Sequence, residues 1–222
     1  MDTYNVTDQY TQMLKSQKQT LLKAKKRKGQ RPHDRAPREQ MYLKFMMSLV
    51  SIKPTKQGRN IQSSFIPLSY LPCTAPLAEL KRIAIRDLQL ETHHRGKYLP
   101  LRVITPPHRM TAIMVLAEDD LADVIILQLY QQEAEDIREA SDAVNVGTIL
   151  LVKEPYFKVM ASGEYGLRVD HLSDVSHVSK DDPRIPATWR PQLLEAECSA
   201  QLLKTKGNTA MGEGNYWQAI TE

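Results

Sequence analysis

Short apolar runs of strand length fill residues 79–175, and they constrain the fold more than any other feature of the chain. In some runs apolar and polar residues alternate, which is typical of half-buried strands, and in others every residue is apolar, which is typical of buried ones. Residues of turn-forming type separate the runs. We therefore expect at least five strands, around residues 83–85, 99–103, 113–116, 124–129 and 149–152.

An acidic, alanine-rich segment at residues 133–144 interrupts the strands and is predicted to be helical. Three strands, a helix and two further strands is the order of an oligonucleotide/oligosaccharide-binding (OB) barrel, a small closed sheet whose helix plugs one end. Pro155 interrupts a later strand and belongs at an edge or a bulge. We expect at least one of its neighbours Tyr156 and Phe157 in the core, the alternative being a peptide-binding surface.

The segments on both sides of this β-rich region differ from it in composition. Prolines there indicate linkers. Residues 38–50 are apolar around a whole helical circumference, which indicates a helix that docks on something. The predicted class is α+β: an OB-like antiparallel barrel between N-terminal elements and C-terminal helices. We divide the chain into a basic flexible arm (1–36), a helix (37–50), a linker (51–78), the barrel (79–175), a second linker anchored by Trp189 (176–192) and a helical segment (193–222).

Charge is distributed unevenly along the chain. Residues 1–70 hold 14 Lys and Arg against 4 Asp and Glu, whereas residues 79–175 hold 11 against 16. An electronegative barrel repels phosphates, which disfavours nucleic acid on it. A local basic patch on one barrel face stays open as an alternative, formed by Arg86, Arg95, Lys97, Arg102 and Arg109.

The positive charges of the N-terminal region are densest in one cluster, which consists of Lys23, Lys25, Lys26, Arg27, Lys28 and Arg31. Such a cluster fits a nuclear import signal or a phosphate-binding arm, since cations gain affinity by releasing counterions from a polyanion. Against this, basic runs on disordered tails are common and are often only solvated. Both interpretations stay open.

Signals for catalysis or metal binding are weak. The two cysteines, Cys73 and Cys198, form no Cys-x-x-Cys pair, so neither a disulfide framework nor a thiolate zinc site is expected. Neighbouring strand residues point to opposite faces, so His93 and His94 are poorly placed to chelate one ion, and we predict turn residues. The acids at 118–120 lack calcium-loop spacing and predict an acidic hairpin tip. Two further histidines, His108 and His171, are candidates for the same metal site or for a general base.

The last twenty residues match the opening of a helical repeat. They resemble the tetratricopeptide family, whose units are 34-residue helical hairpins. Small residues let two helices approach closely, and Gly214 ends the first helix where a positive φ is needed. The chain stops inside this unit, so we expect the front part of a longer protein. The matching positions are Leu203, Gly207, Asn208, Gly214, Tyr216, Ala219 and Ile220.

A wider resemblance covers roughly residues 38–222. The chain resembles the N-terminal half of fungal tetratricopeptide and SET-domain proteins, in which a SET domain, a protein-lysine methyltransferase fold that uses S-adenosylmethionine, follows the repeats. The SET motifs, an Asn-His-x-Cys stretch with a Gly-rich loop and a late tyrosine, do not occur in this chain. The segments that carry the resemblance are Glu91-Thr-His-His-Arg-Gly96, residues 105–112, 127–132 and 152–159, Tyr165-Gly-Leu-Arg-Val-Asp-His171, and the repeat start.

Taken together, these patterns predict a non-catalytic protein-interaction module with no cofactor or metal of its own. S-adenosylmethionine is expected only where a SET domain follows. The expected partner is a protein. The alternative is a nucleic-acid-associated protein that uses the basic arm and the barrel. With no signal-like N-terminus and no long apolar run, we expect a soluble cytoplasmic or nuclear protein without membrane contact.

Overall fold

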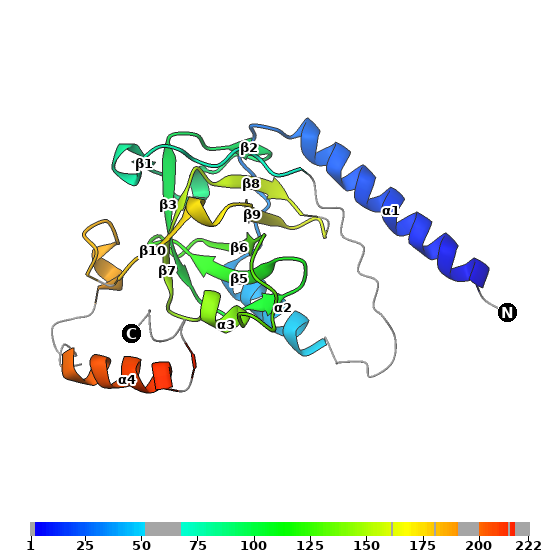
Figure 1. Cartoon of the computed structure of the whole chain (residues 1–222). Coiled ribbons are helices and arrows are strands. Elements are labelled where there is room, and N and C mark those ends of the chain that lie inside the picture. Colours follow the sequence, from blue (N-terminus) through cyan, green and yellow to red (C-terminus); the bar gives the residue numbers. More distant parts are fainter. Residues whose placement is uncertain are drawn as a thin grey trace.

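The computed structural model of the 222-residue chain describes residues 3–51, 68–160, 162–179, 181–190, 200–212 and 214–215. Over these residues a single sheet of short strands is flanked by helices (Figure 1). No helix in the described ranges is long and apolar enough to cross a membrane. The helices are α1 (Thr3–Lys26), α2 (Arg38–Ser51), α3 (Ala140–Ala143) and α4 (Ala200–Gly212), with 3-10 turns η1 (Leu77–Glu79), η2 (Ile85–Asp87), η3 (Leu172–Asp174) and η4 (Ala187–Trp189).

The sheet follows the strand order β10-β7-β3-β5-β6-β9-β8-β2, with β1 paired to β3 and β4 paired to β5. Pairing is parallel for β1 with β3 and for β6 with β9, and antiparallel elsewhere. The strands are β1 (Lys81–Arg82), β2 (Thr92–His93), β3 (Lys97–Val103), β4 (His108–Arg109), β5 (Ile113–Glu118), β6 (Val124–Leu129), β7 (Ile149–Lys153), β8 (Tyr156–Val159), β9 (Tyr165–Val169) and β10 (Val175–His177).

This sheet is strongly curled. Strands β7 and β8 are separated in the chain by only Glu154 and Pro155, although β3, β5, β6 and β9 lie between them in the strand order. In a flat sheet the five strand spacings would separate β7 from β8 by about 24 Å. Three consecutive Cα steps span at most about 11 Å, so the sheet has to bend back on itself. The break falls at the proline, as predicted, and Glu154 adopts a φ of +46° there.

The core lies on the concave side of the curl and is filled by alternate strand residues. Phe157 and Leu127 are fully buried there, and η2 adds Ile85 from the preceding segment. This two-residue period is the one read from the sequence for the alternating runs, and the burial of Phe157 confirms that one aromatic residue after Pro155 packs inside. Trp189 is also buried, beside Ile149 and Ile185, and so anchors the segment that follows β10.

The predicted helix at residues 133–144 is the clearest error in the secondary structure. Only α3 is helical, and it contributes Ala140 and Ala143 to one end of the core. Carboxylates four positions apart would repel each other along a longer helix. Arg109 instead binds two backbone carbonyl oxygens of this segment. It donates to Glu133 O at 2.6 Å and to Arg138 O at 2.9 Å. The predicted strand at residues 83–85 is reduced to β1 followed by η2.

The N-terminal region differs from the expected flexible arm in its second half. Helix α1 extends away from the sheet and has mostly exposed side chains among those described, but its last part reaches the core through the buried Ala24 (Figure 1). Residues 27–36, which we call the strap, then run along the sheet. Gly29 donates to Leu90 O and Leu90 donates to Gln30 O, both at 2.9 Å, so backbone bonds fasten the strap.

Candidate functional site

Helix α2 covers the convex face of strands β5 and β6. Phe45 is 5% exposed and belongs to a second apolar cluster with Leu116 and Ile126, which point away from the main core. Met41 and Leu49 pack against the same cluster, one turn to either side of Phe45. The docking predicted for this helix is therefore onto the chain's own sheet.

The opposite side of α2 is also apolar but lies exposed. Leu43 and Val50 are 62% and 79% exposed, and Met47, which is 60% exposed, lies between them. At 3.6 residues per turn these positions fall on one stripe, about half a turn from Phe45. We call Leu43, Met47 and Val50 the α2 stripe. A helix with two apolar sides is typical of one that packs between two surfaces.

Glu118 links α2 to the sheet through ion pairs with arginines of both elements. The carboxylate is 3% exposed and accepts a hydrogen bond from Arg38 of α2 at 2.6 Å, and others from Arg102 of β3 at 2.5 and 3.1 Å. Burial would by itself raise the pKa of Glu118, but the hydrogen bonds and charges of Arg38 and Arg102 outweigh burial and lower it. The group is thus held ionised.

The predicted acidic tip at residues 118–120 is a hairpin turn, but it is largely buried. Asp119 is 2% exposed and accepts backbone N–H groups of Ile85 at 2.8 Å, Leu121 at 3.0 Å and Asp123 at 3.1 Å. Burial raises the pKa of its carboxyl group. Asp119 therefore has a structural role, because its hydrogen bonds fix η2 to the β5–β6 hairpin.

The basic patch left open by the sequence is mostly neutralised. Four of its five members form ion pairs with carboxylates of the sheet region, which leaves Lys97 outside these pairs. Positive charge that is already paired attracts a polyanion weakly. The pairs are Arg86 with Asp123, Arg95 with Glu154, Arg102 with Glu118 and Arg109 with Glu135.

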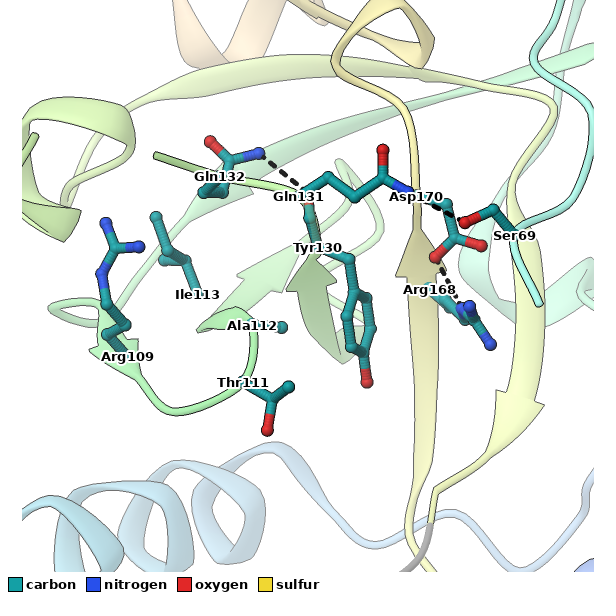
Figure 2. Close-up of a pocket in the computed structure, with 10 residues that line it drawn as sticks. All are labelled: Ser69, Arg109, Thr111, Ala112, Ile113, Tyr130, Gln131, Gln132, Arg168 and Asp170. Atoms are coloured by element: carbon teal, nitrogen blue, oxygen red, sulfur yellow. Dashed lines mark hydrogen bonds and ion pairs between the residues drawn. The ribbon is translucent and has the colours of Figure 1, made fainter. Parts of the chain in front are cut away.

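A hollow of about 270 Å³ lies beside the ends of β6 and β9, and Figure 2 shows the residues that line it. Its polar groups bind one another: Arg168 donates to Asp170 at 2.6 Å, and the Gln131 amide donates to the Ser69 hydroxyl at 2.9 Å. The guanidinium of Arg168 also lies 5.1 Å from the Tyr130 ring centre. These lining residues contain no histidine or cysteine to pair with a hydroxyl group. They are Ser69, Arg109, Thr111, Ala112, Ile113, Tyr130, Gln131, Gln132, Arg168 and Asp170.

A second hollow, of about 240 Å³, opens where the strap meets the start of α2. We call it the Arg35 pocket. The guanidinium of Arg35 lies 5.0 Å from the ring centre of the buried Phe157, and burial lowers the pKa of Arg35. The lining residues are Asp34, Arg35, Ala36, Gln40, Met41, Lys44, Val124, Ile125, Phe157, Gly163, Glu164 and Tyr165.

The histidines weighed as ligands are placed in different surroundings. His93 and His171 pack against the ring of Tyr70, with centroids 4.5 and 5.4 Å apart. His94 is buried, where its Nε2 accepts from Gln89 N and its Nδ1 donates to Pro155 O, each at 3.0 Å. Among the described residues no cluster of three or more His, Cys, Asp or Glu side chains is arranged to hold a metal ion.

The basic cluster lies where α1 ends. Lys23, Lys25 and Lys26 fall in the last turn, where positive side chains stabilise the helix dipole. Arg27 pairs with Asp34 at 3.2 Å and Arg31 with Asp87 at 3.3 Å, so these two cations belong to the strap's own contacts, whereas Lys28 lies exposed. The cluster has a local structural explanation, and a targeting or phosphate-binding role stays a prediction.

The predicted repeat is described only in part. Helix α4 ends at Gly212, and Gly214 follows with φ of +78°, as the sequence predicts for the end of the first helix. Asn208 lies exposed on α4 and Gly207 is half-buried. No second helix of a hairpin lies in the described part of the chain, and the packing roles stay predictions. Tyr216, Ala219 and Ile220 lie outside the described residues, as does the side chain of Leu203.

Comparison with known proteins gives one informative relative. No protein-family model matches the chain. A protein of Gibberella zeae named "Methyltransferase" is 36% identical over 170 residues, which are 77% of this chain and 23% of that protein. The chain thus spans about a quarter of the relative's length.

Two solved structures show only a distant likeness. They are Schizosaccharomyces pombe Pot1pC bound to single-stranded DNA, at 12% identity over 46% of this chain and 90% of that chain, and fission yeast Pot1 with single-stranded DNA, at 10% over 58% and 54%. Both have a TM-score of 0.36. What the comparisons establish is homology: most of this chain corresponds to part of a fungal methyltransferase.

Proposed function

We propose that this chain is a non-catalytic recognition module of a methyltransferase-related protein, and that the α2 stripe is its docking surface for the rest of such a protein. The observation that carries the proposal is the two-sided burial pattern of α2. One side is fixed to the sheet through Phe45, and the other side presents Leu43 and Val50 to solvent. Exposed apolar patches on folded proteins mark interaction sites.

The size of the relative supports an intramolecular partner. About three quarters of the Gibberella zeae protein has no counterpart in this chain. We propose that this remaining part supplies the methyl-transfer chemistry, using S-adenosylmethionine, and that this chain positions it or its substrate. We further propose that the curled sheet is an OB-type barrel in which β7 and β8 act as one bent strand, and that α4 opens a tetratricopeptide unit.

Two observations disfavour the alternative function, nucleic-acid binding. The β5–β6 face, which OB barrels use for oligonucleotides, is occupied here by α2. The arginines of the suggested basic patch are paired with carboxylates. What remains is the lysine cluster at the end of α1, a weak and non-specific electrostatic site.

Charges placed on the α2 stripe are expected to abolish docking. We expect micromolar binding, measured by titration calorimetry, between this chain and the Gibberella zeae protein from which the homologous region has been removed. Leu43→Lys with Val50→Lys should weaken binding at least thirty-fold, because two buried charges would meet an apolar surface without partners. Both positions are exposed in the free chain, so its own stability should change little.

The matched control is Leu121→Lys with Leu172→Lys, two exposed leucines outside α2, 46% and 56% accessible, in the β5–β6 turn and in η3. These substitutions should leave binding unchanged. Equal binding by the α2 variant and the control would contradict the docking role. A single-stranded oligonucleotide serves as the second arm: binding that is tighter than that of the protein partner and persists at high salt would favour the alternative function.

A further inference from the structure

The Arg35 pocket contains a hydrogen-bond donor that the protein leaves unused. The terminal Nη2 of Arg35 is buried and has no hydrogen-bond acceptor among the described residues. Buried polar atoms in folded proteins are nearly always paired, and an orphaned donor loses its hydration without compensation. Because Arg35 lines the pocket, a small movement of its guanidinium toward the hollow would let an oxygen atom there accept from this N–H group.

The walls around this donor are apolar. Val124, Ile125 and Phe157 are at most 8% exposed, and Met41 adds a half-buried side chain from α2. A volume of about 240 Å³ lies just below the range typical of small-molecule sites. The pocket therefore fits one short branched or linear apolar group with an oxygen-bearing end.

The other charges around the pocket balance one another, and Arg35 is the cation there that forms no ion pair in the described part of the chain. Lys44 pairs with Glu164 at 2.8 Å, and Asp34 is held by Arg27 at 3.2 Å and by the Tyr165 hydroxyl at 2.7 Å. Two rim cations, Arg27 and Lys44, are thus matched by two rim carboxylates. The nearby Asp119 and Asp123 also act on Arg35, but they are bound by backbone N–H groups and by Arg86, respectively.

We propose that the Arg35 pocket binds a carboxylate carried on a short apolar chain, with Arg35 as the anion-binding group and Met41, Val124 and Phe157 as the apolar walls. Two sources present this chemistry: a free short-chain acid, or the C-terminal residue of a peptide that ends in an apolar side chain. Capture of terminal carboxylates is a known mode of peptide recognition. This site is separate from the α2 stripe and does not depend on it.

The test is a titration of the ¹⁵N-labelled full chain with 4-methylpentanoate and with 4-methylpentanamide, followed by amide NMR shifts. The acid should saturate in the millimolar range, as expected for a ligand with few contact atoms, and shift Lys44 and Gly163. The uncharged amide should bind at least ten-fold more weakly. Equal binding of the two ligands, or shifts that do not saturate, would overturn the proposal.

Variants assign the effect to the pocket. Arg35→Gln should weaken acid binding at least ten-fold, whereas the control Arg31→Gln, at an exposed strap residue, should not. Gln40→Glu places a negative charge at the exposed rim without touching the core, and should weaken binding several-fold even if Arg35→Gln fails to fold. Retained affinity in the folded Gln40→Glu protein would count against the site.

A last arm identifies the source of the carboxylate. The tripeptide Gly-Gly-Leu with a free C-terminus is compared with its C-terminal amide and with the free acid. Tighter binding of the free tripeptide than of 4-methylpentanoate would identify a peptide terminus, and the reverse order would identify a small acid. Loss of this binding leaves the Leu43 and Val50 experiment unaffected, so the two proposals fail separately.

Discussion

Replacing Phe45 by alanine is expected to lower the free energy of unfolding by about 3–5 kcal/mol, the usual cost of truncating a buried phenylalanine. Phe45 is 5% exposed and lies at the centre of the cluster that joins α2 to Leu116 and Ile126 of the sheet. Its loss leaves a cavity between two elements that come from distant parts of the sequence. The free energy is measured by urea denaturation followed by circular dichroism.

A control for this prediction is available on the same helix. Tyr42 is 40% exposed, so Tyr42→Ala removes an aromatic ring of similar size from a position that water already reaches. We expect a loss of less than about 1 kcal/mol there. If Phe45→Ala and Tyr42→Ala destabilise the protein equally, α2 does not pack on the sheet through Phe45.

Glu118→Gln is expected to destabilise the protein by about 2–3 kcal/mol. Removing one member of a buried ion pair typically costs about 3–5 kcal/mol, because the remaining charge stays without its partner. Arg38 and Arg102 are 44% and 39% exposed, so water compensates them in part and the expected loss is smaller. Thermal or urea unfolding at pH 7 measures it.

The pH dependence of this effect follows from the lowered pKa of Glu118. A carboxylate with a lowered pKa in the folded state stabilises the protein above the unfolded-state pKa of about 4.3, and loses this contribution as the pH falls through the folded-state value. The stability difference between the wild type and Glu118→Gln should therefore be constant near neutral pH and shrink below about pH 4.

The control for Glu118 is Glu164→Gln, which removes a carboxylate that is 33% exposed and pairs with Lys44, itself 66% exposed. Exposed pairs contribute about 0–1 kcal/mol, so little change is expected. A difference for Glu118→Gln that stays the same down to pH 3 would show that its ionised form does not stabilise the fold.

Local patterns correctly predicted four of the five expected strands, because burial on one or both faces produces a regular pattern of apolar residues in the sequence. The alternating Leu99 and Leu101, and the break at Pro155, appear in the structure where the pattern placed them. The apolar circumference of residues 38–50 likewise indicated a docked helix, although it did not say which surface α2 covers.

Contacts between distant residues were not predictable in this way. The sequence predicts Glu118 only as part of an acidic hairpin tip, since nothing near it in the sequence reveals that Arg38, eighty positions earlier, binds it. The strap was read as flexible for the same reason, because its backbone partner Leu90 is some sixty positions away. The sequence does not single out Arg35 as a binding residue, because its position against the buried Phe157 ring is set by the fold and not by neighbouring residues.

The proposed docking surface requires α2 to occupy the convex face of β5 and β6, since this leaves the α2 stripe, and not the sheet, available to a partner. The direct test is a nuclear Overhauser measurement between the Phe45 ring and the methyl groups of Leu116 and Ile126 in the free chain in solution. We predict clear cross-peaks from the ring to both residues. A folded sheet whose Leu116 and Ile126 methyl groups show no contact with Phe45 would contradict the account.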